Sequence, residues 1–211
     1  MKTHASLTIA LTGAFVLALC LADVAATKFI LVGPITAPGG IFLFSIIFIV
    51  RDMLHRVAGA AYVQRTIVIA AILNLAMAAY LYAITRFPAP DFYALAEPWD
   101  TIFAFAPGIV LGSIVAAVTS QLINTSVYAW LWKRGNPLWW RSIGSNLVSL
   151  PIDSIIFTLL AFVILPPIFG GEPIDITNAA ARVASGQTLL KLATVLILTP
   201  LLYATPERGR A

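Results

Sequence analysis

The sequence predicts an all-α integral membrane protein, a single domain over residues 1–211 with six transmembrane helices, of which the second is broken. Composition is the first observation behind this prediction, because the chain is 60% hydrophobic and only 10% charged, with a mean hydropathy of +0.94. Such values are typical of proteins that cross a bilayer several times. The second observation is that long apolar runs alternate with short loops. The third is that the basic residues gather in every second loop.

The first span carries a row of alanines. We expect the spans at about 6–27, 33–51, 66–86, 106–132, 144–167 and 182–204. An alanine recurs at every fourth position of the first one: Ala10, Ala14, Ala18, Ala22 and Ala26. Such a ridge of small residues lets another helix approach closely. Two interpretations stay open, namely packing inside the chain's own bundle and docking onto a partner membrane protein.

The second span is interrupted by two prolines and three glycines in the segment GPITAPGG at 33–40. Proline removes a backbone donor and glycine relaxes the chain, so we expect the helix to be unwound there. The unbroken apolar run at 41–50 would reach only about half of a hydrocarbon core of roughly 30 Å. Irregular backbone at membrane depth must be buried in protein or line a cavity. The segment is therefore a candidate wall or outer lid of a ligand site.

Lys and Arg are divided unevenly between the two sides of the predicted membrane. With the N-terminus inside, nine lie on the cytoplasmic side: Lys2, Arg51, Arg56, Arg65, Lys133, Arg134, Arg141, Arg208 and Arg210. Three lie on the other side: Lys28, Arg86 and Arg182. We therefore expect both termini in the cytoplasm. Because these charges sit in short loops between apolar runs, a nucleic-acid partner is not expected.

Two spans carry polar residues along one helical face each. On the fourth span these are Ser113, Ser120, Gln121, Asn124 and Tyr128. On the fifth they are Ser142, Ser145, Asn146, Ser149 and Asp153. Facing lipid would leave these amides, hydroxyls and the carboxylate unpaired, so we expect the two faces to look at each other. Asn74, the one strong polar group in the middle of the third span, is expected to join helices.

Asp153 is the residue most strongly marked as functional, since a charge in the middle of an apolar span is costly. Lys191, inside the last span, is its natural counter-ion. The pair could serve a ligand site, or it could only fix the register of two helices. Asp153 is also a candidate proton carrier. Asp23 and Lys28, toward the outer end of the first span, could be site residues or an interfacial pair.

Asp52 and Arg56 lie one helical turn apart at the cytoplasmic end of the second span. This spacing predicts a local salt bridge with a structural or gating role. The sequence has no HExxH, no GxSxG and no phosphate-binding glycine loop, so we expect neither an enzyme with catalytic residues nor a cofactor. A single cysteine and two separated histidines give no metal site.

Three blocks of this chain resemble the vitamin uptake transporter family, whose members include bacterial queuosine precursor transporters. They are ATKFILVGPITAPGGIFLFSIIFIVRDMLHRVAG at 26–59, the stretch 112–162 with Ser145, Asp153 and Phe157 in series, and Lys191 followed by Pro200. The resemblance implies a multi-pass protein of the bacterial cytoplasmic (inner) membrane that imports a 7-deazapurine such as 7-cyano-7-deazaguanine. Together with the polar faces, it places six residues around the ligand: Gln121, Asn124, Ser145, Asn146, Asp153 and Lys191.

The family is similar in architecture to the substrate-binding subunits of energy-coupling-factor transporters. In those subunits the alanine ridge of the first helix docks a coupling subunit, which gives the ridge from Ala10 to Ala26 a second meaning. Two alternatives to a self-contained transporter therefore stay open. The chain could be a vitamin-binding subunit that needs an ATP-driven coupling module, or a membrane scaffold that transports nothing. The expected partners are a small-molecule substrate and the lipid bilayer, with a membrane protein on the alanine ridge as a further candidate.

Overall fold

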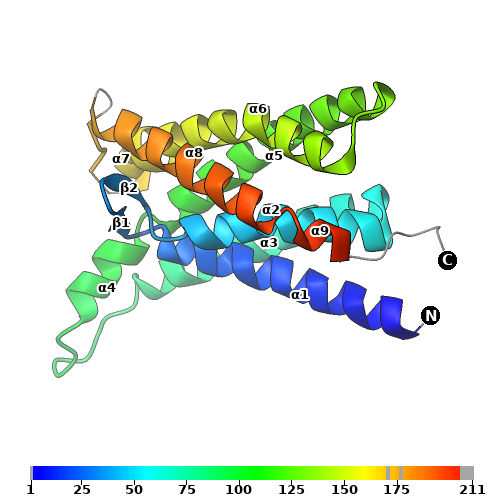
Figure 1. Cartoon of the computed structure of the whole chain (residues 1–211). Helices are drawn as coiled ribbons and strands as arrows, with labels where there is room; N and C mark the ends of the chain where they lie inside the picture. Colours follow the sequence, from blue (N-terminus) through cyan, green and yellow to red (C-terminus); the bar gives the residue numbers. More distant parts are fainter. Residues whose placement is uncertain (1, 170–171, 176–177, 205–211) are drawn as a thin grey trace.

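The computed structural model describes residues 2–169, 172–175 and 178–204, and in them the chain forms a bundle of long helices (Figure 1). Five described segments are long and apolar enough to cross a membrane. They belong to α1 (Lys2–Ala25), α3 (Ala60–Ile84), α5 (Ala106–Lys133), α6 (Leu138–Leu159) and α8 (Ala179–Leu198). The predicted all-helical membrane class is confirmed, with one small sheet added. The shorter helices α4 (Ala96–Phe103), α7 (Pro166–Phe169) and α9 (Leu201–Ala204) and the π-helical turn η1 (Leu160–Ile164) lie between or after these long helices.

The predicted unwound segment is a β-hairpin, and the prediction of a broken second helix is wrong in this respect. Strands β1 (Phe29–Val32) and β2 (Ile35–Pro38) pair antiparallel around a two-residue turn. Gly33 opens that turn with φ +60°, a backbone conformation that favours glycine. Helix α1 ends at Ala25, before the hairpin begins, so the glycines and prolines do not interrupt a helix. The chain therefore enters α2 from a strand.

Helix α2 (Ile41–Ala58) is longer than the apolar run that was expected to form it. Its 18 residues correspond to about 27 Å, close to the thickness of a hydrocarbon core. It lies between the same two ends of the bundle as α1 and α8 (Figure 1). Its last turns carry Arg51, Asp52 and Arg56. Six spans therefore stay a prediction, with α2 as the sixth.

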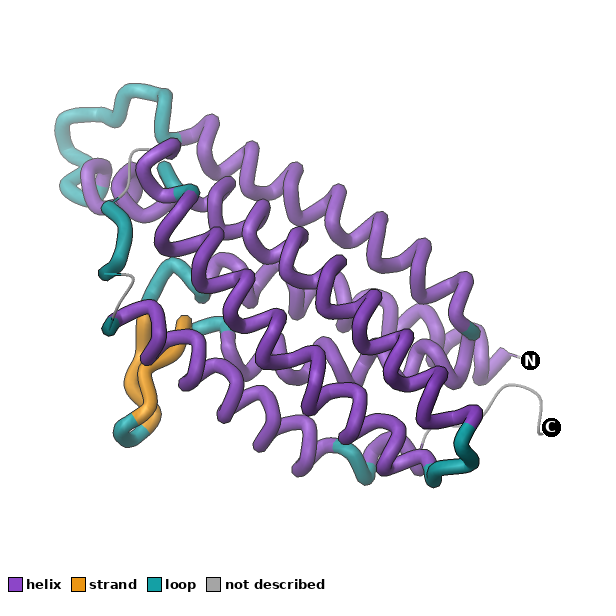
Figure 2. Tube along the Cα trace, turned by 90° about the horizontal axis from the view of Figure 1, so that it is seen from above, coloured by secondary structure: helices purple, strands orange, loops and turns teal. Residues whose placement is uncertain are grey.

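The start of α1 and the short helix α9 lie at one end of the bundle, and the hairpin, α4 and α7 lie at the other (Figures 1 and 2). An even number of crossings between α1 and α9 would give this placement. Arg208 and Arg210, which the charge count includes, lie outside the described residues. Large apolar side chains are exposed along the outer faces of the long helices, among them Ile9, Val68, Ile72, Leu122 and Ile197. These faces suit contact with lipid chains.

The alanine ridge of α1 divides into two parts. Ala18, Ala22 and Ala26 are buried, whereas Ala10 and Ala14 are exposed. The reason is geometric: residues four apart turn through about 400° in an α-helix, so the row drifts by roughly 40° at each step. The buried part confirms packing inside the chain's own bundle. Docking of a partner on the exposed part stays a prediction.

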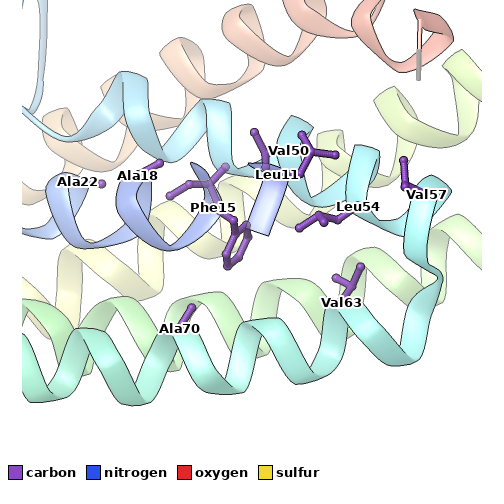
Figure 3. Packing of buried hydrophobic residues seen from close by; sticks show 10 residues of the cluster. Leu11, Phe15, Ala18, Ala22, Val50, Leu54, Val57, Val63 and Ala70 are labelled. Atoms are coloured by element: carbon purple, nitrogen blue, oxygen red, sulfur yellow. The ribbon is translucent and has the colours of Figure 1, made fainter. Parts of the chain in front are cut away.

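The buried part of the ridge lets α2 approach α1 closely. A Cβ atom at Gly40 would overlap the carbonyl oxygen of Ala22, so only glycine fits at this crossing. Below it, apolar side chains of α1, α2 and α3 point toward one another in one cluster, which includes Phe15, Leu54 and Val63 (Figure 3). These three helices therefore form one wall of the space in the middle of the bundle.

The hairpin packs against α8 and η1. Gly186 of α8 lies so close to Thr36 that a Cβ atom there would overlap the Thr36 carbonyl oxygen. The ring of Phe29 in β1 packs on Phe162 in η1, with 4.7 Å between the ring centroids. The hairpin therefore closes one end of the bundle next to α8 and the end of α6.

Candidate functional site

Asp153 and Lys191 form a buried ion pair between α6 and α8. The Lys191 Nζ donates to Asp153 Oδ2 at 2.7 Å, and the two residues are 1% and 6% exposed. Ser120 on α5 donates to the other carboxylate oxygen at 2.8 Å. The ammonium group also donates to Ser154 and to Gln187, each at 3.3 Å. The predicted counter-ion of Asp153 is thus confirmed, and three helices meet at the pair.

The polar faces of α5 and α6 meet as the spacing predicts. Asn124 donates from Nδ2 to Asn146 Oδ1 at 3.1 Å and to Ser149 Oγ at 3.0 Å. Asn146 and Ser145 both donate to the backbone carbonyl of Ser142, at 2.9 Å and 3.1 Å. All five residues are buried. Since their polar groups pair with one another, this network joins two helices and supports the ion pair that lies farther along α6.

A cavity of about 60 Å³ lies beside the ion pair, enclosed by α1, α2, α3, α5, α6 and α8. Three of the predicted binding residues line it: Gln121, Asp153 and Lys191. The other three do not: Asn124, Ser145 and Asn146. Apart from these polar groups, Ser113 and Arg51, the lining is apolar. A small number of polar groups on an apolar wall is the usual construction of a small-molecule site.

Aromatic rings face the charged end of this cavity. The centroids of the Phe44 and Phe157 rings are 5.7 Å apart, and the planes are tilted by 57°. The Lys191 Nζ lies 5.7 Å from the Phe44 centroid. Phe15 and Phe48 add further rings to the lining. A flat, partly polar ring system could therefore be covered on its faces by phenylalanine while its edge meets the carboxylate, the ammonium and the Gln121 amide.

The predicted salt bridge between Asp52 and Arg56 is wrong. Asp52 is instead paired with its neighbour Arg51, whose Nη2 lies 2.8 Å from Oδ1, and its other oxygen accepts from Ser142 at 3.3 Å. Arg56 donates to the backbone carbonyl of Leu202 at 2.5 Å. That carbonyl belongs to the short helix α9, whose terminal carbonyls have no intrahelical partner, and both oxygens of Asp52 already accept from Arg51 and Ser142.

Asp23 and Lys28 do not form the interfacial pair that the sequence left open. Asp23 is buried and accepts a hydrogen bond from Asn74 Nδ2 on α3 at 2.5 Å, which confirms that Asn74 joins two helices. Lys28 is exposed at the start of the hairpin, and its backbone carbonyl accepts from Gly39. Asp23 Oδ1 and Asn74 Oδ1 have no hydrogen-bond partner among the described residues.

Three residues of the site were missed by reasoning from the sequence. Gln187 precedes Lys191 by four residues, a spacing that places both on one helical face and could have marked it. Arg51 lines the cavity although it was counted only as a loop charge. Phe44 lies in a continuous apolar run, and no pattern in the sequence separates it from its lipid-facing neighbours.

Comparison with known proteins gives the family of this chain and one named relative. The family model described as "Putative vitamin uptake transporter" matches residues 38–205. A relative from Bacillus subtilis (strain 168), named "Probable queuosine precursor transporter", is 28% identical over 177 residues, which cover 82% of this chain and 73% of the relative. No solved structure matches the chain. Because the family model spans most of the chain, including α2 and the ion pair, the protein belongs to the vitamin uptake transporter family of membrane proteins.

Proposed function

We propose that the protein imports a queuosine precursor, 7-cyano-7-deazaguanine or a similar 7-deazapurine, across the bacterial cytoplasmic (inner) membrane, with both termini in the cytoplasm. The observation that carries the proposal is the Asp153–Lys191 ion pair on the wall of a mostly apolar cavity that four phenylalanines help to line. The name of the relative supplies the substrate class.

The hydrogen-bonding groups of a 7-deazaguanine ring match those on the wall of this cavity, which has to widen beyond its volume of about 60 Å³ to hold the ring. The ring nitrogen N–H and the exocyclic amino group are donors, and a carboxylate has about four acceptor positions. Ser120 and Lys191 each use one position on Asp153, so acceptor capacity remains for two donors on the substrate edge. The Lys191 ammonium or the Gln121 amide would meet the ring carbonyl. Because the cavity is mostly apolar, hydrogen bonds made there are stronger than in water, and an analogue that lacks a donor would leave Asp153 underbonded.

The three predicted binding residues that do not line the cavity support its wall from the α5–α6 interface. Asn124, Ser145 and Asn146 belong to the network that fixes α5 against α6. We place them outside direct contact with the ring, where they hold Ser120 and Asp153 at a constant separation. Arg51 lines the cavity and is paired with Asp52, which accepts a hydrogen bond from Ser142 of α6. This pair would act as the gate toward the cytoplasm.

The test is rescue of queuosine-modified tRNA in a bacterium that lacks its own precursor synthesis and its own transporter, supplied with nanomolar precursor. Wild-type protein should restore the modification, and Asp153→Asn, expressed to the same level, should not. Loss of hydrogen bonds to a charged group costs about 1.5–3 kcal/mol, which corresponds to roughly a ten- to hundredfold loss of affinity. Asp91→Asn, in an exposed loop, is the matched control. Failure of well-expressed wild-type protein to rescue would refute the substrate.

A binding subunit that depends on a coupling module is the alternative, and the exposed part of the alanine ridge favours it. Ala10, Gly13 and Ala14 form a smooth exposed surface on α1 that nothing in the described chain covers. Co-purification with an ATP-driven module would support this alternative, whereas uptake by this chain alone in cells without such a module would exclude it. A scaffold without cargo predicts that substitutions at Gln121 and Asp153 change stability and leave ligand affinity unaltered.

A further inference from the structure

Asp23 is a buried carboxyl group with no cation beside it. It is 2% exposed, two residues before the end of α1, and the described ion pairs do not include it. One oxygen accepts from the Asn74 amide, and the other has no hydrogen-bond partner in the described chain. Asn74 is fully buried, and its own oxygen also lacks a partner there. These two acceptor oxygens from neighbouring helices have no hydrogen bond among the described residues, and the Ser113 hydroxyl of α5 is the other polar group beside Asp23.

A proton is the simplest group that satisfies both oxygens. An isolated ionised carboxylate inside a membrane protein is costly, and protonation removes the charge. The resulting carboxylic acid has one O–H donor, which suits an amide oxygen. The amide of Asn74 offers either a donor or an acceptor depending on its orientation about the last side-chain torsion. Asn74 can therefore donate to an ionised Asp23 and accept from a protonated one.

The surroundings of Asp23 give it no neutralising charge. Three helices pack against α1, and the stretches of them around Gly40, Asn74 and Ser113 hold no titratable side chain: 41–50 on α2, 66–79 on α3 and 106–127 on α5. Cys20 on α1 itself and Asp153 on α6 are the titratable groups that interact with Asp23. Asp153 is itself paired with the Lys191 ammonium, so that ion pair supplies no net positive charge to Asp23.

Asp153 has the close partners that Asp23 lacks. Its two oxygens accept from the Lys191 ammonium and the Ser120 hydroxyl. That Asp153 carries the proton stays a prediction from the sequence, and Asp23 is a second candidate for that role. Helix α5 links the two carboxyl groups, because Ser113 lies beside Asp23 and Ser120 bonds Asp153, two turns farther along the same face.

We propose that Asp23 is the proton-binding residue that couples substrate uptake to the proton gradient, with Asn74 and Ser113 as the groups that hold the acid. The inference rests on the proposed transport function. Ser113 also lines the cavity, so the proton site is separated from the substrate site by one side chain. The proton binds an oxygen of Asp23 from the outer side and leaves as hydronium to water on the cytoplasmic side. A metal ion is disfavoured, because no group of three or more His, Cys, Asp or Glu side chains suited to one lies among the described residues.

The experiment uses the purified full-length protein in vesicles of phosphatidylethanolamine and phosphatidylglycerol that contain a pH-sensitive dye, with labelled 7-cyano-7-deazaguanine as the probe. An inward proton gradient of one pH unit should give about a tenfold accumulation of a neutral solute that moves with one proton. Addition of the probe without a gradient should acidify the vesicle interior. Asp23→Asn should lose both effects, and should still exchange internal for external probe at the wild-type rate, because exchange moves no net proton. Asp91→Asn should behave as wild type.

Accumulation by the wild type that ignores the pH gradient, or that follows a sodium gradient instead, would overturn the inference. Accumulation by Asp23→Asn equal to that of the wild type would do the same. If Asp23→Asn does not fold, two other measurements decide whether a carboxyl group at this position couples uptake to protons. They are the behaviour of Asp23→Glu, which keeps a carboxyl group, and the acidification signal of the wild type. Wild-type vesicles that neither accumulate nor exchange the probe would refute the proposed substrate, and the inference with it.

Discussion

Removal of both partners of the Asp153–Lys191 pair should destabilise the bundle no more than removal of one partner. In Lys191→Met the carboxylate keeps only the Ser120 hydroxyl, and in Asp153→Asn the ammonium keeps two neutral oxygens. Breaking a buried pair from one side costs 3–5 kcal/mol in general. Asp153 borders the cavity, where water can reach an unpaired group, so we expect about 3 kcal/mol for each single change.

The double variant should cost no more than either single one, because no charge is left unpaired and Met fills the space of the lysine stem. The coupling energy between the two positions is then about 3 kcal/mol, the upper end of what contacting residues show. It is measurable as a double-mutant cycle on the free energy of unfolding, from titrations with sodium dodecyl sulfate followed by the fluorescence of the five tryptophans. Lys191→Met combined with Asp91→Asn provides an additive control.

A coupling energy indistinguishable from that of the control would refute the reasoning. It would mean that Asp153 and Lys191 are each solvated independently in the folded protein, so that the 2.7 Å contact contributes no net stability. The interpretation of Lys191 as the group that keeps Asp153 ionised would then fail, and so would the contrast between Asp153 and Asp23.

Three further predictions concern packing and binding. Gly40→Ala should destabilise the protein by about 1–3 kcal/mol in the same unfolding titration, because the new methyl group overlaps the carbonyl of Ala22, whereas Gly13→Ala, which meets nothing, should be neutral or slightly stabilising. Gln121→Ala should weaken binding of 7-cyano-7-deazaguanine, measured by equilibrium dialysis, with little change in stability, because its amide lines the cavity. Asn124→Ala should do the reverse and cost about 1–3 kcal/mol of stability, since it leaves buried partners on α6 unsatisfied.

The polar interior of the bundle could be predicted from the sequence because lipid imposes a simple rule. Any amide, hydroxyl or charge in an apolar span must turn inward, and residues that share a helical face turn inward together. This rule predicts that the face with Asn124 meets the face with Asn146 and that Asp153 pairs with Lys191, without any knowledge of the tertiary structure. The same rule identifies the inner face without saying which of its residues border empty space and which pair with one another.

The hairpin could not be predicted in this way, because short apolar runs are ambiguous between helix and strand. The signal was nevertheless present in the four-residue runs FILV and ITAP on either side of Gly33 and Pro34. The salt bridge assigned to Arg56 failed for a different reason. Spacing along a helix describes local neighbours only, and the carbonyl of Leu202 that Arg56 reaches lies 146 residues away in the chain.

Two carboxyl groups in one small bundle allow two roles because their neighbours differ. Asp153 has an ammonium group at 2.7 Å. Asp23 has an amide and a hydroxyl, neither of which carries charge, so its ionised form leaves an unpaired charge in the bundle. The closed packing of α1, α3 and α5 around Asp23 therefore suits the protonated acid, whereas the ionised carboxylate would destabilise it. A proton bound at Asp23 would bias the helices that enclose the substrate cavity, which is the differential interaction that coupling requires.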